Sequence, residues 1–285
     1  MKAEYKPFVD ELIELCIKED IGDGDHTSLS CIPSDEHGRM RLLCKQEGII
    51  AGIEIAQVVF HRLDPEMEFE QVLSDGDRVK PGDVAFYVSG RLRSLLQAER
   101  IILNIMQRMS GVATQTAVYV DRLAGLHTRV LDTRKTTPGM RVFEKAAVEI
   151  GGGSNHRYNL STAVMLKDNH IDAAGGVTRA IEMARAHASF TTTVEIECEN
   201  LDMVREAVEA GADIIMLDNM THDDMAAAIE LIAGRAKTEC SGNVDASNIR
   251  ALADLGVDYI SSGALTHSAP ILDLSLKHLR LLDGK

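Results

Sequence analysis

Apolar residues in the second half of the chain follow two patterns that alternate. Short apolar segments predict strands at residues 129–132, 163–168, 193–197, 213–218, 238–242 and 259–263. Between them, apolar residues recur at helical spacing and predict helices at residues 140–151, 177–188, 201–211, 222–234 and 246–256. This repeat implies parallel strands with right-handed crossovers, and strands that are apolar on both faces indicate a barrel or a doubly wound sheet. No GxGxxG sequence follows the first strand, which argues against a dinucleotide-binding fold.

The first part of the chain has a different pattern. Residues 5–19 have the apolar spacing of an amphipathic helix, and residues 38–90 look rich in strands, with a helix at 54–63. A long, largely apolar helix is predicted to start at the capping residue Ser94. Ser110-Gly111 is expected to break it before a second helix that ends near Leu123.

These patterns divide the chain into two domains. We predict an N-terminal α+β sandwich domain at residues 1–111 and an α/β domain at residues 112–269. Residues 270–285 are predicted to form a C-terminal helix that packs back on the N-terminal domain.

Composition excludes several classes of protein. The 285 residues carry a formal net charge of -14, which argues against nucleic-acid binding because that needs a basic face. The chain shows no export signal and no apolar run long enough to span a membrane. Its five cysteines are scattered without a CxxC pair, so we expect reduced thiols in a cytoplasmic protein.

One stretch, residues 130–170, reverses the overall charge. It holds six Lys or Arg residues, with Arg129 directly before it, and only four acidic residues. A basic segment in an acidic protein predicts a pocket for a small anion.

Every predicted strand of the α/β domain ends in polar residues. In strand order they are Asp132 with Arg134 and Lys135, Lys167 with Asp168, Glu195 with Glu197, Asp218 with Asn219, Ser241-Gly242-Asn243, and Ser262-Gly263-Ala264. In a barrel the carboxyl ends of the strands share one face, where the chemistry takes place. Six polar strand ends therefore predict a site assembled there.

The residue types suggest what this site binds. Arg134, Lys135, Arg157 and Lys167, with His156, would form a cationic wall for carboxylates or phosphates. Glu197 and Asp218 offer the hard oxygen ligands that suit Mg²⁺. The turns at 241–243 and 263–264 are small, as phosphate-binding turns at the last strands of a barrel are.

Several residues also have a structural interpretation. Arg141 and Lys145 fit exposed helix pairs with Glu144 and Glu149, and His170 fits a structural hydrogen bond better than a base. Either Glu195 or Glu197 could serve only to balance charge, and Met165 fits core packing. Arg100 could pair with Glu99 on a helix surface, or be delivered to a site by an interface helix.

The motifs LDTRKTTPGMR, GGGSNHR, LKDNH, VEIECEN, IIMLDN, SGN and GALTH occur in this order. Together they resemble the quinolinate phosphoribosyltransferase family (nicotinate-nucleotide pyrophosphorylase, carboxylating), over nearly the whole chain. The resemblance implies an incomplete, seven-stranded (β/α) barrel beside an N-terminal α+β domain. It also implies a homodimer whose sites are completed by the partner's N-terminal domain. The six strands predicted above are one short, and we expect the seventh before Leu126 or near the C-terminus.

The resemblance also assigns roles to individual residues. It makes Arg134, His156 and Arg157, with Arg100 of the partner subunit, the pocket for the two carboxylates of quinolinate. Lys135 and Lys167 lie between quinolinate and phosphoribosyl pyrophosphate. Glu197 and Asp218 hold the ribose hydroxyls and Mg²⁺, and the 5′-phosphate is bound by Ser241, Gly242, Asn243, Gly263 and Ala264. Two alternatives stay open: a sister phosphoribosyltransferase (for nicotinate, or a molybdenum-operon paralogue), and a non-catalytic anion-binding regulator.

Overall fold

The computed structural model describes residues 3–282 of the chain, which fold into two compact units. The first unit combines the described residues up to Ala117 with Thr137–Gly152 and the segment from Ala269 on. The second unit consists of Val118–Thr136 and Gly153–Ser268.

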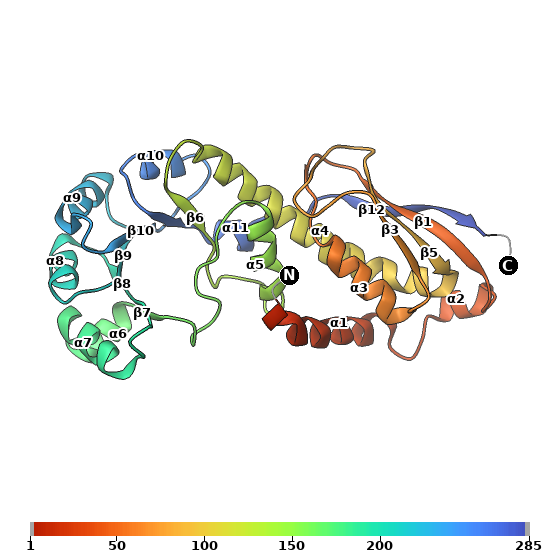
Figure 1. Ribbon diagram of the computed structural model, residues 1–285, viewed down its shortest axis with the longest axis horizontal. Coiled ribbons are helices and arrows are strands. Elements are labelled where there is room, and N and C mark those ends of the chain that lie inside the picture. The colour runs from red at the N-terminus through yellow and green to blue at the C-terminus, as the bar shows by residue number, and fades with distance from the viewer. Residues whose placement is uncertain (1–2, 283–285) are drawn as a thin grey trace. The chain divides into compact units, whose positions relative to one another are not determined.

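The first unit is an α+β sandwich built on a four-stranded antiparallel sheet (Figure 1). Its strand order is β12 (Leu274–Leu281), β1 (His37–Cys44), β5 (Val84–Arg91) and β3 (Glu68–Gln71). Residues of β1 alternate between outward and buried positions, as a sheet with one covered face requires. Two short strands, β2 (Gly48–Ile49) and β4 (Arg78–Val79), form a separate pair.

This unit also contains several helices. They are a 3₁₀ turn at Ala3–Tyr5, α1 (Lys6–Ile21), α2 (His26–Cys31), α3 (Ile53–Leu63) and α5 (Arg141–Ile150). Phe60 of α3 packs edge-on against Phe86 of β5, with ring centroids 6.0 Å apart, so the buried side of α3 faces the sheet. The predicted helices at 5–19 and 54–63 are therefore confirmed.

The C-terminal helix predicted at residues 270–285 is wrong, because Leu274–Leu281 form strand β12. This strand pairs antiparallel with β1, with Leu276 opposite Leu42. Leu274 and Leu276 are buried at a spacing of two, whereas Leu279 and Leu281 are exposed. The last three residues of the predicted segment lie outside the described residues.

The predicted break at Ser110-Gly111 is also wrong, since α4 (Leu92–Arg122) runs through both residues. A Cβ atom at Gly111 would lie 1.9 Å from the carbonyl oxygen of Pro270. The Ser110 hydroxyl accepts a hydrogen bond from the Ala51 amide at 2.9 Å. The two residues therefore allow close packing of the helix and do not end it.

Two residues of α5 contradict the prediction of exposed pairs. Glu144 and Lys145 are both buried. Glu144 accepts a charged hydrogen bond from Arg108 of α4, 2.8 Å away. The helix buries this carboxylate because an arginine partner is available for it.

The second unit is an incomplete α/β barrel with a parallel sheet of six strands. The order is β6 (Arg129–Leu131), β11 (Tyr259–Ser261), β10 (Lys237–Ser241), β9 (Ile214–Asp218), β8 (Val194–Cys198) and β7 (Val164–Leu166). The connecting helices are α6 (Asp168–Ala174), α7 (Val177–His187), α8 (Leu201–Glu209), α9 (His222–Ile232), α10 (Ile249–Ala253) and α11 (Ala264–His267). Figure 1 shows α7, α8 and α9 on the outer side of the curved sheet. All six predicted strands and all five predicted helices are confirmed, although α5 belongs to the first unit.

A short segment lies between the two edge strands, β6 and β7. Ser154 forms a single parallel bridge with Leu131 of β6. Three residues later, Arg157 donates a side-chain hydrogen bond to the carbonyl of Ala163, directly before β7, at 3.2 Å. Within residues 3–282 this bridge is the nearest equivalent of the implied seventh strand, so the expected places for it were wrong.

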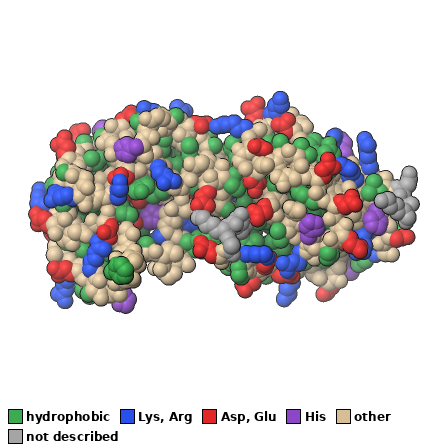
Figure 2. Space-filling model, viewed as in Figure 1, with side chains coloured by type: hydrophobic (Ala, Val, Ile, Leu, Met, Phe, Trp, Pro, Cys, Tyr) green, Lys and Arg blue, Asp and Glu red, His purple; other side chains and the backbone are tan. Residues whose placement is uncertain are grey.

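Charged side chains of both signs are spread over the surface of the described residues (Figure 2). On the face shown in Figure 2, basic and acidic side chains are interspersed and form no single basic area among the described residues. No helix within residues 3–282 combines the length and apolar character needed to cross a membrane.

Candidate active site

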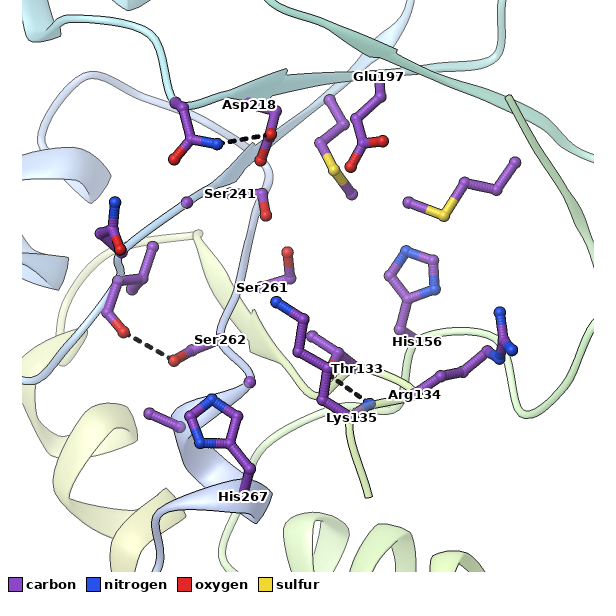
Figure 3. A pocket seen from close by; sticks show the side chains of 18 of the residues that line it. Thr133, Arg134, Lys135, His156, Glu197, Asp218, Ser241, Ser261, Ser262 and His267 are labelled. Atoms are coloured by element: carbon purple, nitrogen blue, oxygen red, sulfur yellow. Dashed lines mark hydrogen bonds between the residues drawn. The ribbon is translucent and has the colours of Figure 1, made fainter. Parts of the chain in front are cut away.

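The carboxyl ends of the barrel strands surround a cavity of about 850 Å³ (Figure 3). It is lined by residues that follow all six strands, and every lining residue belongs to the second unit. All predicted site residues except Arg100 line it: Arg134, Lys135, His156, Arg157, Lys167, Glu197, Asp218, Ser241, Gly242, Asn243, Gly263 and Ala264. The structure thus brings these residues together, and the roles implied for them stay predictions.

Arg100 does not line this cavity. It is an exposed residue of α4 in the part that belongs to the first unit. Its predicted contribution to the site of a partner subunit stays a prediction.

The loop after β6 supplies two cations to the cavity. The main chain of Lys135 is held at both ends, because its amide donates to Thr133 Oγ1 at 3.0 Å and its carbonyl accepts from Thr266 Oγ1 at 2.9 Å. The side chains of Arg134 and Lys135 are exposed. A rigid main chain with exposed cationic ends suits the capture of an anion from solvent.

Arg157 adds a third, half-buried cation. Burial lowers the pKa of its guanidinium, and the neighbouring charge of Arg134 lowers it further, while Glu195 and Glu197 act in the opposite direction. An arginine stays charged under these conditions. Two guanidinium groups that repel each other favour an anion between them.

Acidic groups face these cations from β8 and β9 (Figure 3). Both carboxylate oxygens of Glu197 accept hydrogen bonds from Lys167 Nζ, at 2.7 and 2.8 Å. Asp218 accepts from its neighbour Asn219 at 2.8 Å. Both carboxylates are half-buried, and their hard oxygen atoms are of the kind that Mg²⁺ prefers.

Two small-residue turns close the other side of the cavity. Gly242 has φ +96°, and a Cβ atom there would lie 2.2 Å from Asn219 Oδ1, so the turn requires glycine. Ser262 Oγ donates to the carbonyl of Val244 at 2.8 Å and joins the turn at 241–243 to the one at 263–264. Both turns expose main chain toward the cavity, as a phosphate site needs.

His156 connects the cavity to two buried acids below it. Its Nε2 lies 3.2 Å from Glu195 Oε2 and 3.6 Å from Glu239 Oε2, and both carboxylates are almost fully buried. Burial raises the pKa of Glu239 to about 7, and the charge of Glu195 raises it further. Within residues 3–282 these three side chains are also the one group of His, Cys, Asp or Glu whose ligand atoms lie close enough to hold a metal ion.

Family models match both parts of the chain. The model described as quinolinate phosphoribosyl transferase, N-terminal domain, matches residues 25–110, and the corresponding C-terminal domain matches residues 112–277. The chain belongs to the quinolinate phosphoribosyltransferase family. The family predicted from the sequence motifs is thereby confirmed.

Members of this family resemble the chain over most of its length. The probable nicotinate-nucleotide pyrophosphorylase [carboxylating] of Synechocystis sp. is 43% identical, covering 95% of this chain and 93% of the relative. Quinolinate phosphoribosyltransferase [decarboxylating] 1b of Nicotiana tabacum is 42% identical, covering 93% and 81%. The crystal structure of NadC from Streptococcus pyogenes superposes with a TM-score of 0.93 at 46% identity, covering 96% and 97%.

Some features of this quinolinate phosphoribosyltransferase site could not be found from sequence. Glu239 is the single acid of β10, whose other residues are Lys, Thr, Cys and Ser, and nothing in the sequence shows that it faces the barrel interior. Met165 was expected in the core but lines the cavity, as do Met216 and His267. His170 does have the predicted structural role, since its Nδ1 accepts from the Lys167 amide at the start of α6.

Proposed function

We propose that the chain transfers the phosphoribosyl group of phosphoribosyl pyrophosphate to the ring nitrogen of quinolinate. The products are nicotinate mononucleotide, pyrophosphate and CO₂, so the enzyme is a decarboxylating pentosyltransferase of NAD biosynthesis. The observation that carries this proposal is the single cavity in which cations, two carboxylates and two phosphate-type turns meet, in a chain of this family.

The cations offset the electrostatic repulsion between two polyanionic substrates. Each contact between unit charges near 4 Å is worth about 4 kcal/mol at an effective dielectric of about 20. Arg134 and Arg157 bind the two carboxylates of quinolinate, because guanidinium groups match planar carboxylates. Lys135 and Lys167 lie between the substrates and offset their mutual repulsion.

The acids stabilise the sugar as the bond to pyrophosphate breaks. The pyridine nitrogen attacks the anomeric carbon while pyrophosphate leaves, and the ribosyl group becomes similar to an oxocarbenium ion. Glu197 and Asp218 hold the ribose hydroxyls and place negative charge beside this cation. The turns at 241–243 and 263–264 anchor the 5′-phosphate and fix the sugar for attack.

Mg²⁺ is the cofactor that we propose for this reaction. Glu197 and Asp218 would hold it, and when bound it supplies positive charge to the leaving pyrophosphate. The support for this choice is that two hard-oxygen carboxylates on the neighbouring strands β8 and β9 line the same cavity.

Decarboxylation follows from the positive charge created on the ring. Once the nitrogen is bonded to ribose it is quaternary, and it accepts electron density from the adjacent carbon. The bond to the 2-carboxylate breaks, CO₂ leaves, and the carbanion at that position takes a proton. Nicotinate has no carboxylate there, so this step distinguishes the two substrates.

The substrate assignment can be tested in parallel assays. With Mg²⁺ and phosphoribosyl pyrophosphate, we expect pyrophosphate release with quinolinate and much slower release with nicotinate. Preference for nicotinate would identify the sister phosphoribosyltransferase. Binding of both substrates without any pyrophosphate release would identify a non-catalytic anion-binding protein.

We also propose a homodimer in which Arg100 of the partner subunit completes the carboxylate pocket. The support is the exposed position of Arg100 on α4 and its absence from the cavity of its own chain. Inactive Arg100→Ala and Lys135→Ala proteins should regain activity when their subunits are mixed, because one site of each heterodimer is then intact. Absence of rescue under confirmed subunit exchange would contradict a shared site.

We propose a cytoplasmic location. The five cysteines are all free, which fits a reducing compartment. A plant relative from Oryza sativa is described as chloroplastic, so fractionation of the source cells should compare the cytosol with organelles.

A further inference from the structure

The chemistry proposed above leaves two buried acids without a role. Glu195 and Glu239 are 2% and 1% exposed and face the barrel interior beneath the cavity. Burial of two carboxylates is costly unless they are hydrogen-bonded. Their shared neighbour is His156, on the segment between the edge strands.

The hydrogen bonds of His156 determine where its ring proton lies. The Arg157 amide donates to Nδ1 at 2.7 Å, so Nδ1 acts as an acceptor and carries no proton. The remaining ring nitrogen, Nε2, faces the carboxylate of Glu195, with which it forms a hydrogen bond of 3.3 Å to Oε1. A carboxylate accepts, so Nε2 carries the proton and the imidazole is neutral.

A protonated imidazole does not fit this arrangement. An imidazolium would place a second proton on Nδ1, directly opposite the amide proton of Arg157 at the same distance of 2.7 Å. The guanidinium of Arg157 is a positive charge near Glu195, since Glu195 and Glu197 both act to raise its pKa.

His156 in turn fixes the position of Arg157. The main chain of His156 is anchored by its amide, which donates to Asp132 Oδ1 at 2.8 Å. Arg157 is then held twice, by its amide at His156 Nδ1 and by its side chain at the carbonyl of Ala163. Loss of the first contact would loosen the segment that carries this guanidinium.

We propose that Glu195 is a positioning residue that holds His156 as a neutral imidazole protonated on Nε2. His156 then acts on the substrate by placing Arg157, and not as a cation that binds a carboxylate. This deepens the proposed function, because it assigns the charge of the dicarboxylate pocket to the arginines and lysines alone.

The first test needs no substrate and is independent of the proposed function. Long-range ¹H–¹⁵N spectra of the labelled full chain at pH 7.5 should show His156 with a proton on Nε2 and none on Nδ1. The signals are assigned, among ten histidines, by their loss in His156→Asn. A doubly protonated ring, or a proton on Nδ1, would overturn the proposal.

The second test uses kinetics and depends on the proposed function. Glu195→Ala removes the acceptor, and we expect KM for quinolinate to rise about 10-fold with KM for phosphoribosyl pyrophosphate unchanged. Glu195→Gln keeps an acceptor oxygen without the charge, and should restore KM to within about 3-fold of the parent. The control is Asp258→Asn, a carboxylate at the opposite ends of the strands, which should change neither KM. If Glu195→Gln is as defective as Glu195→Ala, the charge of Glu195 is what matters and the proposal is wrong.

Discussion

Replacing Glu239 by glutamine should stabilise the protein relative to the parent, and this gain should be larger at alkaline pH than at acidic pH. Burial raises the pKa of Glu239 from an ordinary value of 4.5 to about 7 in the folded chain. The folded state therefore keeps the proton that the unfolded chain has already lost. The stability linked to this proton is fully present below pH 4.5 and is lost as the pH rises through 7.

The magnitude follows from the difference between the two pKa values. A difference of about 2.5 pKa units corresponds to about 3 kcal/mol, and most of it is lost between pH 5 and pH 8. Glutamine has the same shape as the protonated acid and no charge to lose. The free energy of unfolding of Glu239→Gln should thus gain about 2 to 3 kcal/mol on the parent over this pH interval.

Urea unfolding followed by circular dichroism measures this difference, because the chain has no tryptophan for fluorescence. Asp258→Asn is a suitable control. Although burial acts to raise it, hydrogen bonds from Lys237 and Thr238 lower the pKa of Asp258 below 3.8. This variant should lose the same stability at pH 5 and pH 8. A Glu239→Gln protein that differs from the parent by the same amount at both pH values would refute the reasoning.

Three further predictions concern other parts of the molecule. Lys135→Ala and Lys167→Ala should each lower turnover at least about 100-fold with an unchanged far-ultraviolet circular dichroism spectrum. The control Lys45→Ala, which removes a surface pair with Asp273, should be fully active. Pyrophosphate release near the parent rate by either of the first two variants would refute the role of the lysine replaced. Gly111→Ala should destabilise the protein by about 1 to 3 kcal/mol, as measured by its urea midpoint, although alanine normally favours a helix. A stabilised variant would show that α4 does not pack against Pro270. Chelation of Mg²⁺ should abolish pyrophosphate release, and its re-addition should restore it; activity in the presence of excess chelator would contradict the metal requirement.

The barrel could be predicted from sequence because its signals are local. Most strands of the second unit are short apolar segments, and the helices between them have clear periodicity, so all six were located. The C-terminal strand was missed because Leu272, Leu276 and Leu279 recur at helical spacing, and only pairing with β1 selects the extended form. In this segment the tertiary contacts, and not the local sequence pattern, determined the secondary structure.

The site likewise combines features with a local sequence signal and features that depend on tertiary contacts. Polar residues directly after apolar strands are visible in sequence, and the barrel brings them to one cavity. Glu239 and the hydrogen bonds of His156 depend on contacts between strands that are distant along the chain. The single bridge between Ser154 and Leu131 has no periodic signal at all. Arg100 cannot be placed by one chain alone, because its expected role involves a second copy.

The most direct test of the proposed reaction is the release of CO₂ from quinolinate labelled in its 2-carboxylate. The purified chain is incubated with Mg²⁺, with and without phosphoribosyl pyrophosphate, and CO₂, pyrophosphate and mononucleotide are measured together. We predict that the three products appear in equal amounts and only when phosphoribosyl pyrophosphate is present. Pyrophosphate release without CO₂, or CO₂ release without phosphoribosyl pyrophosphate, would contradict it.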